Sequence, residues 1–152
     1  MKLPPTKEEA LISAWRHPQA LVRQGRCLST SGVVTSCQDT SDGLKAGVQS
    51  LAAASGVGFV VEEGALPVAG IVAEVAQLTQ GHLTSVILGD SVDFQLVFTV
   101  AEEGASRLSK IFAEAGLQLF DIGYATEELQ VRLRRTDGRK EELPGVPWRH
   151  AT

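Results

Sequence analysis

The chain has 152 residues, of which 43% are hydrophobic and 21% charged, a balance typical of one globular domain with a core of its own. Its net charge of −4 argues against a surface that binds nucleic acid or an anionic membrane. No apolar run approaches the ~20 residues of a membrane span, and residues 1–5 lead into a polar helix rather than a signal peptide, so we expect a cytoplasmic protein.

Two helices are predicted at the start of the chain. Thr6 and Glu9 form a capping-box pattern, in which each side chain satisfies a backbone N–H of the other residue. This helix is expected to end at His17, because Pro18 disfavours a helical residue before it. Pro18 suits the first turn of a second helix, which residues 29–32 interrupt.

The most regular helical pattern follows. Leu44, Val48 and Leu51 repeat at helical spacing, and Gly56 is placed to end that helix. The flanking elements are expected to be strands over 33–37 and 57–61 and a helix over 71–81.

The second half predicts mainly strands. The β-branched run 84–88 is interrupted after Gly89 and resumes as a strand over 94–100, followed by a helix over 102–115. Runs 117–124 and 129–135 are expected to pair, and Asp137-Gly138 is a hairpin-turn signal that returns the chain through 139–143. The alternation predicts an α+β fold, with helices packed on a mixed β-sheet.

The cysteines and histidines indicate no catalytic or metal cluster. Cys27 and Cys37 have neither CxxC spacing nor nearby histidines, which argues against zinc, and we expect small buried thiols. His17, His82 and His150 are scattered and offer no partner for a Ser–His or Cys–His hydrolase.

The most informative stretch is Asp39-Thr40-Ser41-Asp42-Gly43-Leu44, here named the acidic segment, which joins a predicted strand to a predicted helix. Its oxygen-bearing side chains can all serve as helix caps. The alternative is that Asp39 and Asp42 hold Mg²⁺, which prefers oxygen ligands, while Ser41 and the helix start meet a phosphate.

Two further stretches each allow two interpretations. Gly89-Asp90-Ser91-Val92-Asp93 is either a bulge or turn, or a segment whose Asp90 and Asp93 add oxygen ligands or contact a cationic ligand. The basic run 132–135 has the alternation of a half-solvated strand, with Glu141 and Glu142 near enough to balance it. A nucleic-acid surface is the weaker alternative, because no aromatic residues interleave with these charges. Trp148 is either a core residue or a stacking platform.

Taken in order, these motifs resemble those of the thiamine-monophosphate kinases, a branch of the aminoimidazole-ribonucleotide synthetase superfamily. The acidic segment resembles the D-x-S-D-G-L motif of that family, whereas sister families carry T-G-G-like residues there. The other matching runs are 53–58, 66–67, 87–98 and 145–150. The resemblance extends from about His17 to His150 and implies a mixed sheet flanked by helices in α/β/α layers.

The resemblance also implies roles for individual residues. Asp39 and Asp42 correspond to metal ligands for Mg²⁺, Ser41 to an ATP contact, and Trp148 to an aromatic residue against the thiamine moiety. Where the family has G-G-E-D-Y-E, this chain has Asp90-Ser91-Val92-Asp93-Phe94-Gln95. Asp93 therefore remains on the substrate side, whereas Val92 replaces a glutamate placed to meet the substrate.

Only the second half of the family's enzyme is covered. We expect residues 1–16 to form a linker helix and residues 17–152 the kinase-like C-terminal domain, with the N-terminal ATP-binding domain absent. The expected function is that of the substrate-side half of an ATP-dependent kinase that converts thiamine phosphate to thiamine diphosphate, inactive alone. Its expected partners are a thiamine-phosphate-like ligand and either a second copy or the missing domain. The alternative is a stand-alone, non-catalytic domain that binds a small ligand or a protein.

Overall fold

The computed structural model describes residues 3–89 and 93–146. Its helices are α1 (Pro5–Arg16), α2 (Val22–Ser31), α3 (Leu44–Ser55), α4 (Gly70–Leu78), α5 (Leu83–Leu88) and α6 (Ala105–Glu114), with single 3-10 turns η1 (Glu63–Ala65) and η2 (Glu102–Gly104). Its strands are β1 (Val34–Asp39), β2 (Gly58–Glu62), β3 (Leu96–Val100), β4 (Gly123–Thr126), β5 (Val131–Arg134) and β6 (Lys140–Glu142).

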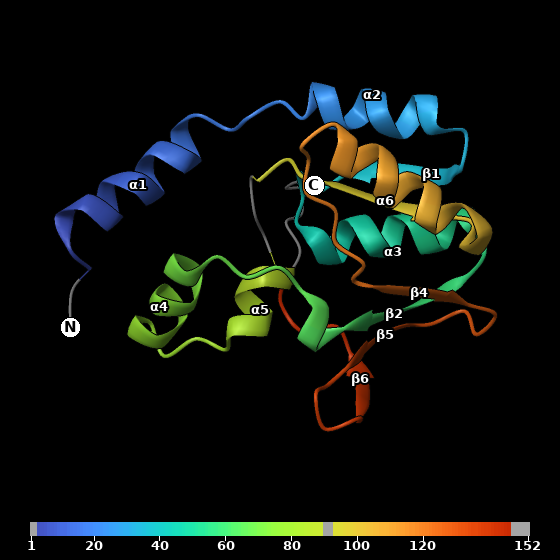
Figure 1. Cartoon of the computed structure of the whole chain (residues 1–152). Helices are drawn as coiled ribbons and strands as arrows, with labels where there is room; N and C mark the ends of the chain where they lie inside the picture. The colour runs from blue at the N-terminus through green and yellow to red at the C-terminus, as the bar shows by residue number, and fades with distance from the viewer. Residues whose placement is uncertain (1–2, 90–92, 147–152) are drawn as a thin grey trace, which may run out of the picture.

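The elements stack in layers around helix α3 (Figure 1). On one side of α3, β1 and β3 form a two-stranded antiparallel sheet, whose other face is covered by α2 and α6. On the opposite side lies a four-stranded sheet in the order β4-β2-β5-β6, in which β2 runs parallel to β5 and antiparallel to β4. The predicted α+β fold with a mixed sheet is therefore confirmed.

Two apolar clusters hold these layers together. In the larger one, Val48 and Leu51 of α3 pack with Phe59 and Val61 of β2 and with Leu133 of β5, which is fully buried. The smaller cluster is centred on Leu28 of α2 and on Leu108 and Phe112 of α6. Helix α3 is thus fixed by the four-stranded sheet, and its first residue, Leu44, is the last residue of the acidic segment.

Strand β2 lies inside the sheet, which corrects the expectation that runs 117–124 and 129–135 pair with each other. Residues 117–122 form no strand, β4 begins only at Gly123, run 129–135 contains β5, and β2 separates the two strands. Four successive residues of β2, from Gly58 to Val61, are buried. A strand that is buried on both faces belongs in the interior of a sheet, with partners on both edges.

Helix α5 is a second correction, because run 84–88 was expected to be extended. Thr84 and Leu88 are both buried, and their spacing of four residues places them on one side of a helix that packs on α4. A short apolar run does not by its periodicity distinguish a buried strand from a helix. Tertiary packing therefore determines that run 84–88 is a helix and not a strand.

The first two helices differ from the prediction at their starts. Pro4 is the N-cap of α1 and Pro5 occupies its first turn, so the Thr6–Glu9 capping box is not formed. Helix α2 begins at Val22, and Pro18 lies in the extended link before it. No described helix is long and apolar enough to cross a membrane.

Cys37 is exposed and Cys27 half-buried, so the expectation of two buried thiols is wrong. Cys37 lies on β1, where alternate side chains point outward. Partial burial first, and the nearby Asp39 carboxylate second, raise the pKa of the Cys37 thiol. The thiol therefore stays protonated at neutral pH, which is the opposite of what an activated nucleophile needs.

Candidate functional site

The acidic segment leads from the end of β1 into the first turn of α3. The buried Thr40 holds it: its N–H donates to the Gln95 carbonyl at 2.8 Å, and its hydroxyl accepts from the Gln95 N–H at 3.1 Å. Gly43 closes the turn by donating to the Thr40 carbonyl at 2.9 Å. Its φ of +92° is in a region that favours glycine.

None of the side chains of the acidic segment caps α3. The N-cap residue is Gly43, and within the described parts of the chain no side chain accepts a hydrogen bond there. The Asp39 carboxylate is exposed and accepts a bond from the Ser41 hydroxyl at 3.2 Å, while Asp42 is half-buried. The capping interpretation therefore does not account for the two aspartates.

Two carboxylates are few for a metal site made by the protein alone. In residues 3–89 and 93–146, no group of three or more His, Cys, Asp or Glu side chains is placed to hold a metal ion. Mg²⁺ is, however, usually bound through one or two carboxylates, with water and substrate phosphates completing its shell. The donor set of Asp39 and Asp42 fits that pattern and does not fit a closed structural site.

The other sequence-predicted segments approach the acidic segment from two directions. Gln95, which pairs with Thr40, lies two residues after Asp93, and the Asp93 side chain is exposed. Phe94 adopts a φ of +49°, uncommon for an aromatic residue, as the chain turns into β3. Asp90 and Trp148 lie outside the described residues.

The C-terminal segment is joined to the start of α3 by a lysine. Lys45 lies in the first turn of α3, and its Nζ donates to the Gly145 carbonyl at 2.9 Å. Gly145 in turn packs backbone against backbone on Gly89, at the end of α5. Residues 39–45, 89, 93–95 and 145 therefore converge, although they come from three separate parts of the sequence.

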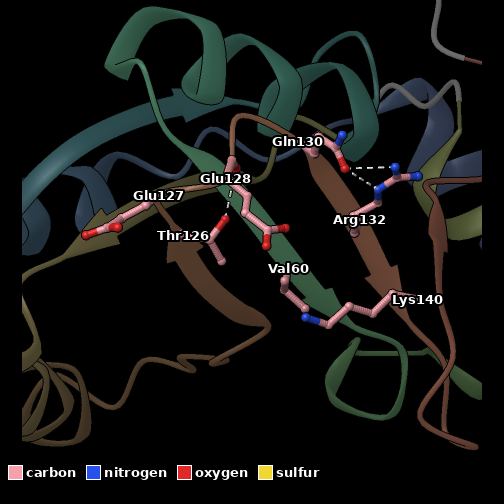
Figure 2. Close-up of a pocket in the computed structure, with 7 residues that line it drawn as sticks. All are labelled: Val60, Thr126, Glu127, Glu128, Gln130, Arg132 and Lys140. Atoms are coloured by element: carbon pink, nitrogen blue, oxygen red, sulfur yellow. Dashed lines mark hydrogen bonds between the residues drawn. The ribbon is translucent and has the colours of Figure 1, made fainter.

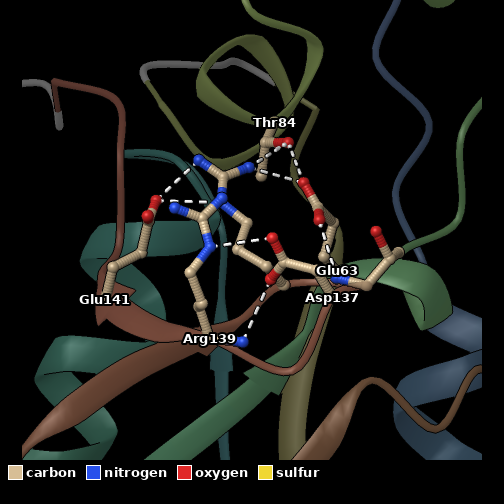
Figure 3. A network of polar contacts seen from close by, with 7 residues as sticks. Glu63, Thr84, Asp137, Arg139 and Glu141 are labelled. Carbon is tan, nitrogen blue, oxygen red and sulfur yellow. Dashed lines mark hydrogen bonds and ion pairs between the residues drawn. The ribbon is translucent and has the colours of Figure 1, made fainter.

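A polar network beside the sheet was not foreseen from the sequence (Figure 3). Arg135, after β5, donates to Glu63 at 2.5 Å, to Glu141 at 2.6 Å and to the Thr84 hydroxyl at 3.2 Å. Thr84 also donates to Glu63 at 2.8 Å, which ties α5 to η1. The expectation that Glu141 balances the basic run is confirmed, but Glu63 lies 72 residues from Arg135 in sequence, and no local pattern pairs them.

The ionisation of this network follows from its hydrogen bonds. The backbone N–H of Thr136, then the Arg135 guanidinium and the Thr84 hydroxyl, lower the pKa of Glu63. Glu141 and Glu63 together raise the pKa of Arg135. Glu63 and Arg135 are therefore both charged at neutral pH, and the role of the network is to fix the β5–β6 hairpin against η1 and α5.

Two grooves of the described surface lie elsewhere, on the face of the four-stranded sheet turned away from α3. One groove of about 330 Å³ runs beside Val60, and the residues that line it carry both charge signs (Figure 2). A second, wider groove of about 850 Å³ follows Tyr124, Arg134 and Gly138. Both are shallow and neither includes the acidic segment, so we place the candidate site by its chemistry rather than by concavity.

The family model for the AIR synthase related protein, C-terminal domain, matches residues 9–135. The chain belongs to this family. The thiamine-monophosphate kinase of Pyrococcus horikoshii is 29% identical over 140 residues, which are 92% of this chain and 41% of that protein. The chain thus spans about two-fifths of the length of the curated relatives it matches.

Solved structures share the fold. AaThiL in complex with AMPPCP and TMP superimposes with a TM-score of 0.76 at 24% identity, covering 99% of this chain and 43% of that one. Escherichia coli HypE, a hydrogenase maturation protein, gives a TM-score of 0.72 at 28% identity, covering 86% of this chain and 42% of that one. The resemblance to the C-terminal domain of thiamine-monophosphate kinase is confirmed, and the fold is shared with a protein of different function.

Proposed function

We propose that this chain is the substrate-side half of an ATP-dependent kinase acting on thiamine phosphate to form thiamine diphosphate, and that it is inactive as this polypeptide alone. The observation that carries the proposal is the acidic segment: its two aspartates are not used as helix caps, yet they lie where two other family motifs, in runs 87–98 and 145–150, converge. The related Pyrococcus kinase supports thiamine phosphate as the substrate class.

Each residue of the site has a distinct role in this proposal. Asp39 and Asp42 hold Mg²⁺, which when bound neutralises phosphate charge and positions the phosphoryl group for transfer. The Ser41 hydroxyl, now bonded to Asp39, is available to orient a phosphate oxygen of ATP. Asp93 and Trp148 belong to the substrate side, where an indole ring suits the cationic thiazolium of thiamine.

Calorimetric titration tests the metal and nucleotide roles. The purified chain is titrated with Mg²⁺, with Mg²⁺-ATP and with thiamine phosphate, and Asp42→Asn is compared with Asp121→Asn, which changes an exposed aspartate before β4. We expect Asp42→Asn alone to weaken Mg²⁺-dependent binding, by about tenfold for the loss of one charged ligand. Equal affinities in the two variants would contradict the metal assignment, and thiamine diphosphate made by this chain alone would contradict its inactivity.

The second candidate function is a non-catalytic domain that assembles with a second copy of the chain. Helix α1 favours it, because it contains no buried residue and exposes 66% of Trp15 and 41% of Ile12. In Figure 1 it projects from the body of the domain, linked to α4 by the pair Lys7–Glu74. Light scattering after size exclusion measures the oligomeric state. A parent chain that is a dimer, and that becomes a monomer in the Ile12→Ser, Trp15→Ser double variant, supports this candidate, whereas a monomeric parent chain refutes it.

A further inference from the structure

The hydroxyl of Thr40 takes the place of a backbone acceptor where the acidic segment meets segment 93–95. The Thr40 N–H donates to the Gln95 carbonyl at 2.8 Å, as in an antiparallel ladder. The Thr40 carbonyl, however, accepts from Gly43 at 2.9 Å, in the turn that leads into α3. The Gln95 N–H therefore donates to the Thr40 hydroxyl instead, at 3.1 Å. Only 4% of Thr40 is exposed, so water is a poor substitute for this acceptor.

The methyl group of Thr40 lies near α3, so the two branches of this side chain serve different neighbours. A Cβ atom on Gly47 would lie 3.8 Å from the Thr40 methyl carbon and 3.4 Å from the Asp39 carbonyl oxygen. The acidic segment is thus held by β1, by the Gly43 turn and by close packing on α3. Segment 93–95 meets it through the two backbone bonds of its last residue, and one of these depends on the Thr40 hydroxyl.

The residue before Gln95 has a backbone conformation that needs such support. Phe94 has a φ of +49°, and 41% of it is exposed, so burial of its ring does little to hold it there. A left-handed conformation of an aromatic residue persists where the surrounding contacts impose it. The Gln95 side chain also donates to the Asp93 carbonyl at 3.1 Å. The bonds of Gln95 therefore set the direction in which the chain passes from Asp93 into β3.

We propose that Thr40 is a positioning residue, whose hydroxyl fixes Asp93 relative to Asp39 and Asp42. The proposal rests on the proposed function in that Asp93 is taken as the substrate side of the site and the other two aspartates as its metal side. Thr40 is buried and acts through Gln95, without contact to the reacting groups. Its position requires a residue that gives its carbonyl to the turn into α3 and still offers a second acceptor, which a hydroxyl side chain supplies.

Nuclear magnetic resonance tests the hold on Asp93 without any ligand. Thr40→Val keeps the shape of the side chain and removes the hydroxyl, whereas Thr40→Ser keeps the hydroxyl and removes the methyl group. We expect Thr40→Val to speed amide hydrogen exchange at Gln95 by about fivefold, the equivalent of one neutral hydrogen bond, and to lower the heteronuclear NOE of the Asp93 amide. Thr40→Ser should keep both signals at the parent's values. Thr126→Val, which removes a hydroxyl on β4, should change neither.

Two results overturn the proposal. One is an Asp93 NOE in Thr40→Val that equals the parent's, in a variant that melts cooperatively. The other is an equal change in Thr40→Ser, which would assign the effect to the lost methyl group. If Thr40→Val does not fold, the comparison of Thr40→Ala with Thr40→Ser isolates the hydroxyl in a smaller side chain, and equal NOE values in that pair overturn the proposal in the same way.

Binding then separates this proposal from the proposed function. If Thr40 acts through Asp93, Thr40→Val weakens thiamine phosphate about fivefold and costs nothing further in an Asp93→Asn background. Losses that add in the double variant overturn the route through Asp93. If the parent chain binds no thiamine phosphate, the proposed function fails, whereas the NOE and exchange signals still decide whether Thr40 holds segment 93–95.

Discussion

Replacement of Arg135 by methionine should destabilise the fold, because it removes the ion pairs with Glu63 and Glu141 and the hydrogen bond to Thr84. Arg135 forms ion pairs with the carboxylates of Glu63 and Glu141. The exposed fraction of its own side chain is 26%, that of the Glu63 side chain is 21% and that of the Glu141 side chain is 40%. A hydrogen bond to a charged group contributes about 1.5–3 kcal/mol net, and partial exposure reduces this toward the value of surface pairs. For two such pairs we expect a loss of about 2–3 kcal/mol in the free energy of unfolding at pH 7.

The matched control is Arg139→Met in the same hairpin. Arg139 pairs with Asp137, but 76% and 52% of the two side chains are exposed, so its loss should leave the free energy of unfolding nearly unchanged. Urea unfolding followed by far-ultraviolet circular dichroism measures both variants, and an unchanged m-value shows that the denatured state is the same. Equal midpoints for the two variants would refute the reasoning.

The pH dependence of the Arg135→Met difference has a definite sign. The pKa of Glu63 is lowered in the folded state, so its contribution is present above the unfolded pKa of about 4.3 and is lost as pH falls through the folded value. The difference between wild type and Arg135→Met should therefore be constant from pH 7 to about pH 5 and shrink below pH 4. A difference that grows on acidification would exclude Glu63 as the partner that matters.

The remaining predictions concern the core and a close backbone approach. Leu133→Ala, at a fully buried position, should lower the free energy of unfolding by about 3 kcal/mol, whereas Leu129→Ala, at 75% exposure, should change it by less than about 0.5 kcal/mol. Comparable losses in urea unfolding would contradict the packing of α3 on β5. Gly58→Ala should abolish cooperative melting, because its Cβ would lie 1.7 Å from the Glu128 carbonyl oxygen, while Gly70→Ala, with nothing within 4 Å, should melt like the wild type. Cooperative melting of Gly58→Ala would show that the backbone around Glu128 and Gln130 can move away from the added methyl group at little cost.

Local features of the fold were predictable because their causes are local. The helical spacing of Leu44, Val48 and Leu51 and the left-handed Gly56 that ends α3 both appear as expected. The hairpin at Asp137-Gly138 does too, with Gly138 at a φ of +87°. Each of these elements is decided by residues within a few positions of one another.

Elements that depend on distant partners were not predictable in this way. Run 84–88 has the composition of a strand, yet it forms α5, which places Leu88 in the core cluster around α3 and Thr84 against Glu63. The pairing of Arg135 with Glu63 likewise depends on β2 and β5 being parallel neighbours, which no hairpin rule predicts.

In the candidate site too, some features are determined by local sequence and others by tertiary structure. The sequence alone determined the acidic segment, its donor chemistry and its family resemblance, since these depend on residue type and spacing within six positions. Tertiary structure alone decided that Gly43 and not an aspartate is the N-cap of α3. It also decided that Lys45 donates to the Gly145 carbonyl, where the Gly145 backbone packs on that of Gly89. The physical reason is that capping and close approach depend on backbone geometry imposed by the packed sheet, and residue types permit that geometry without specifying it.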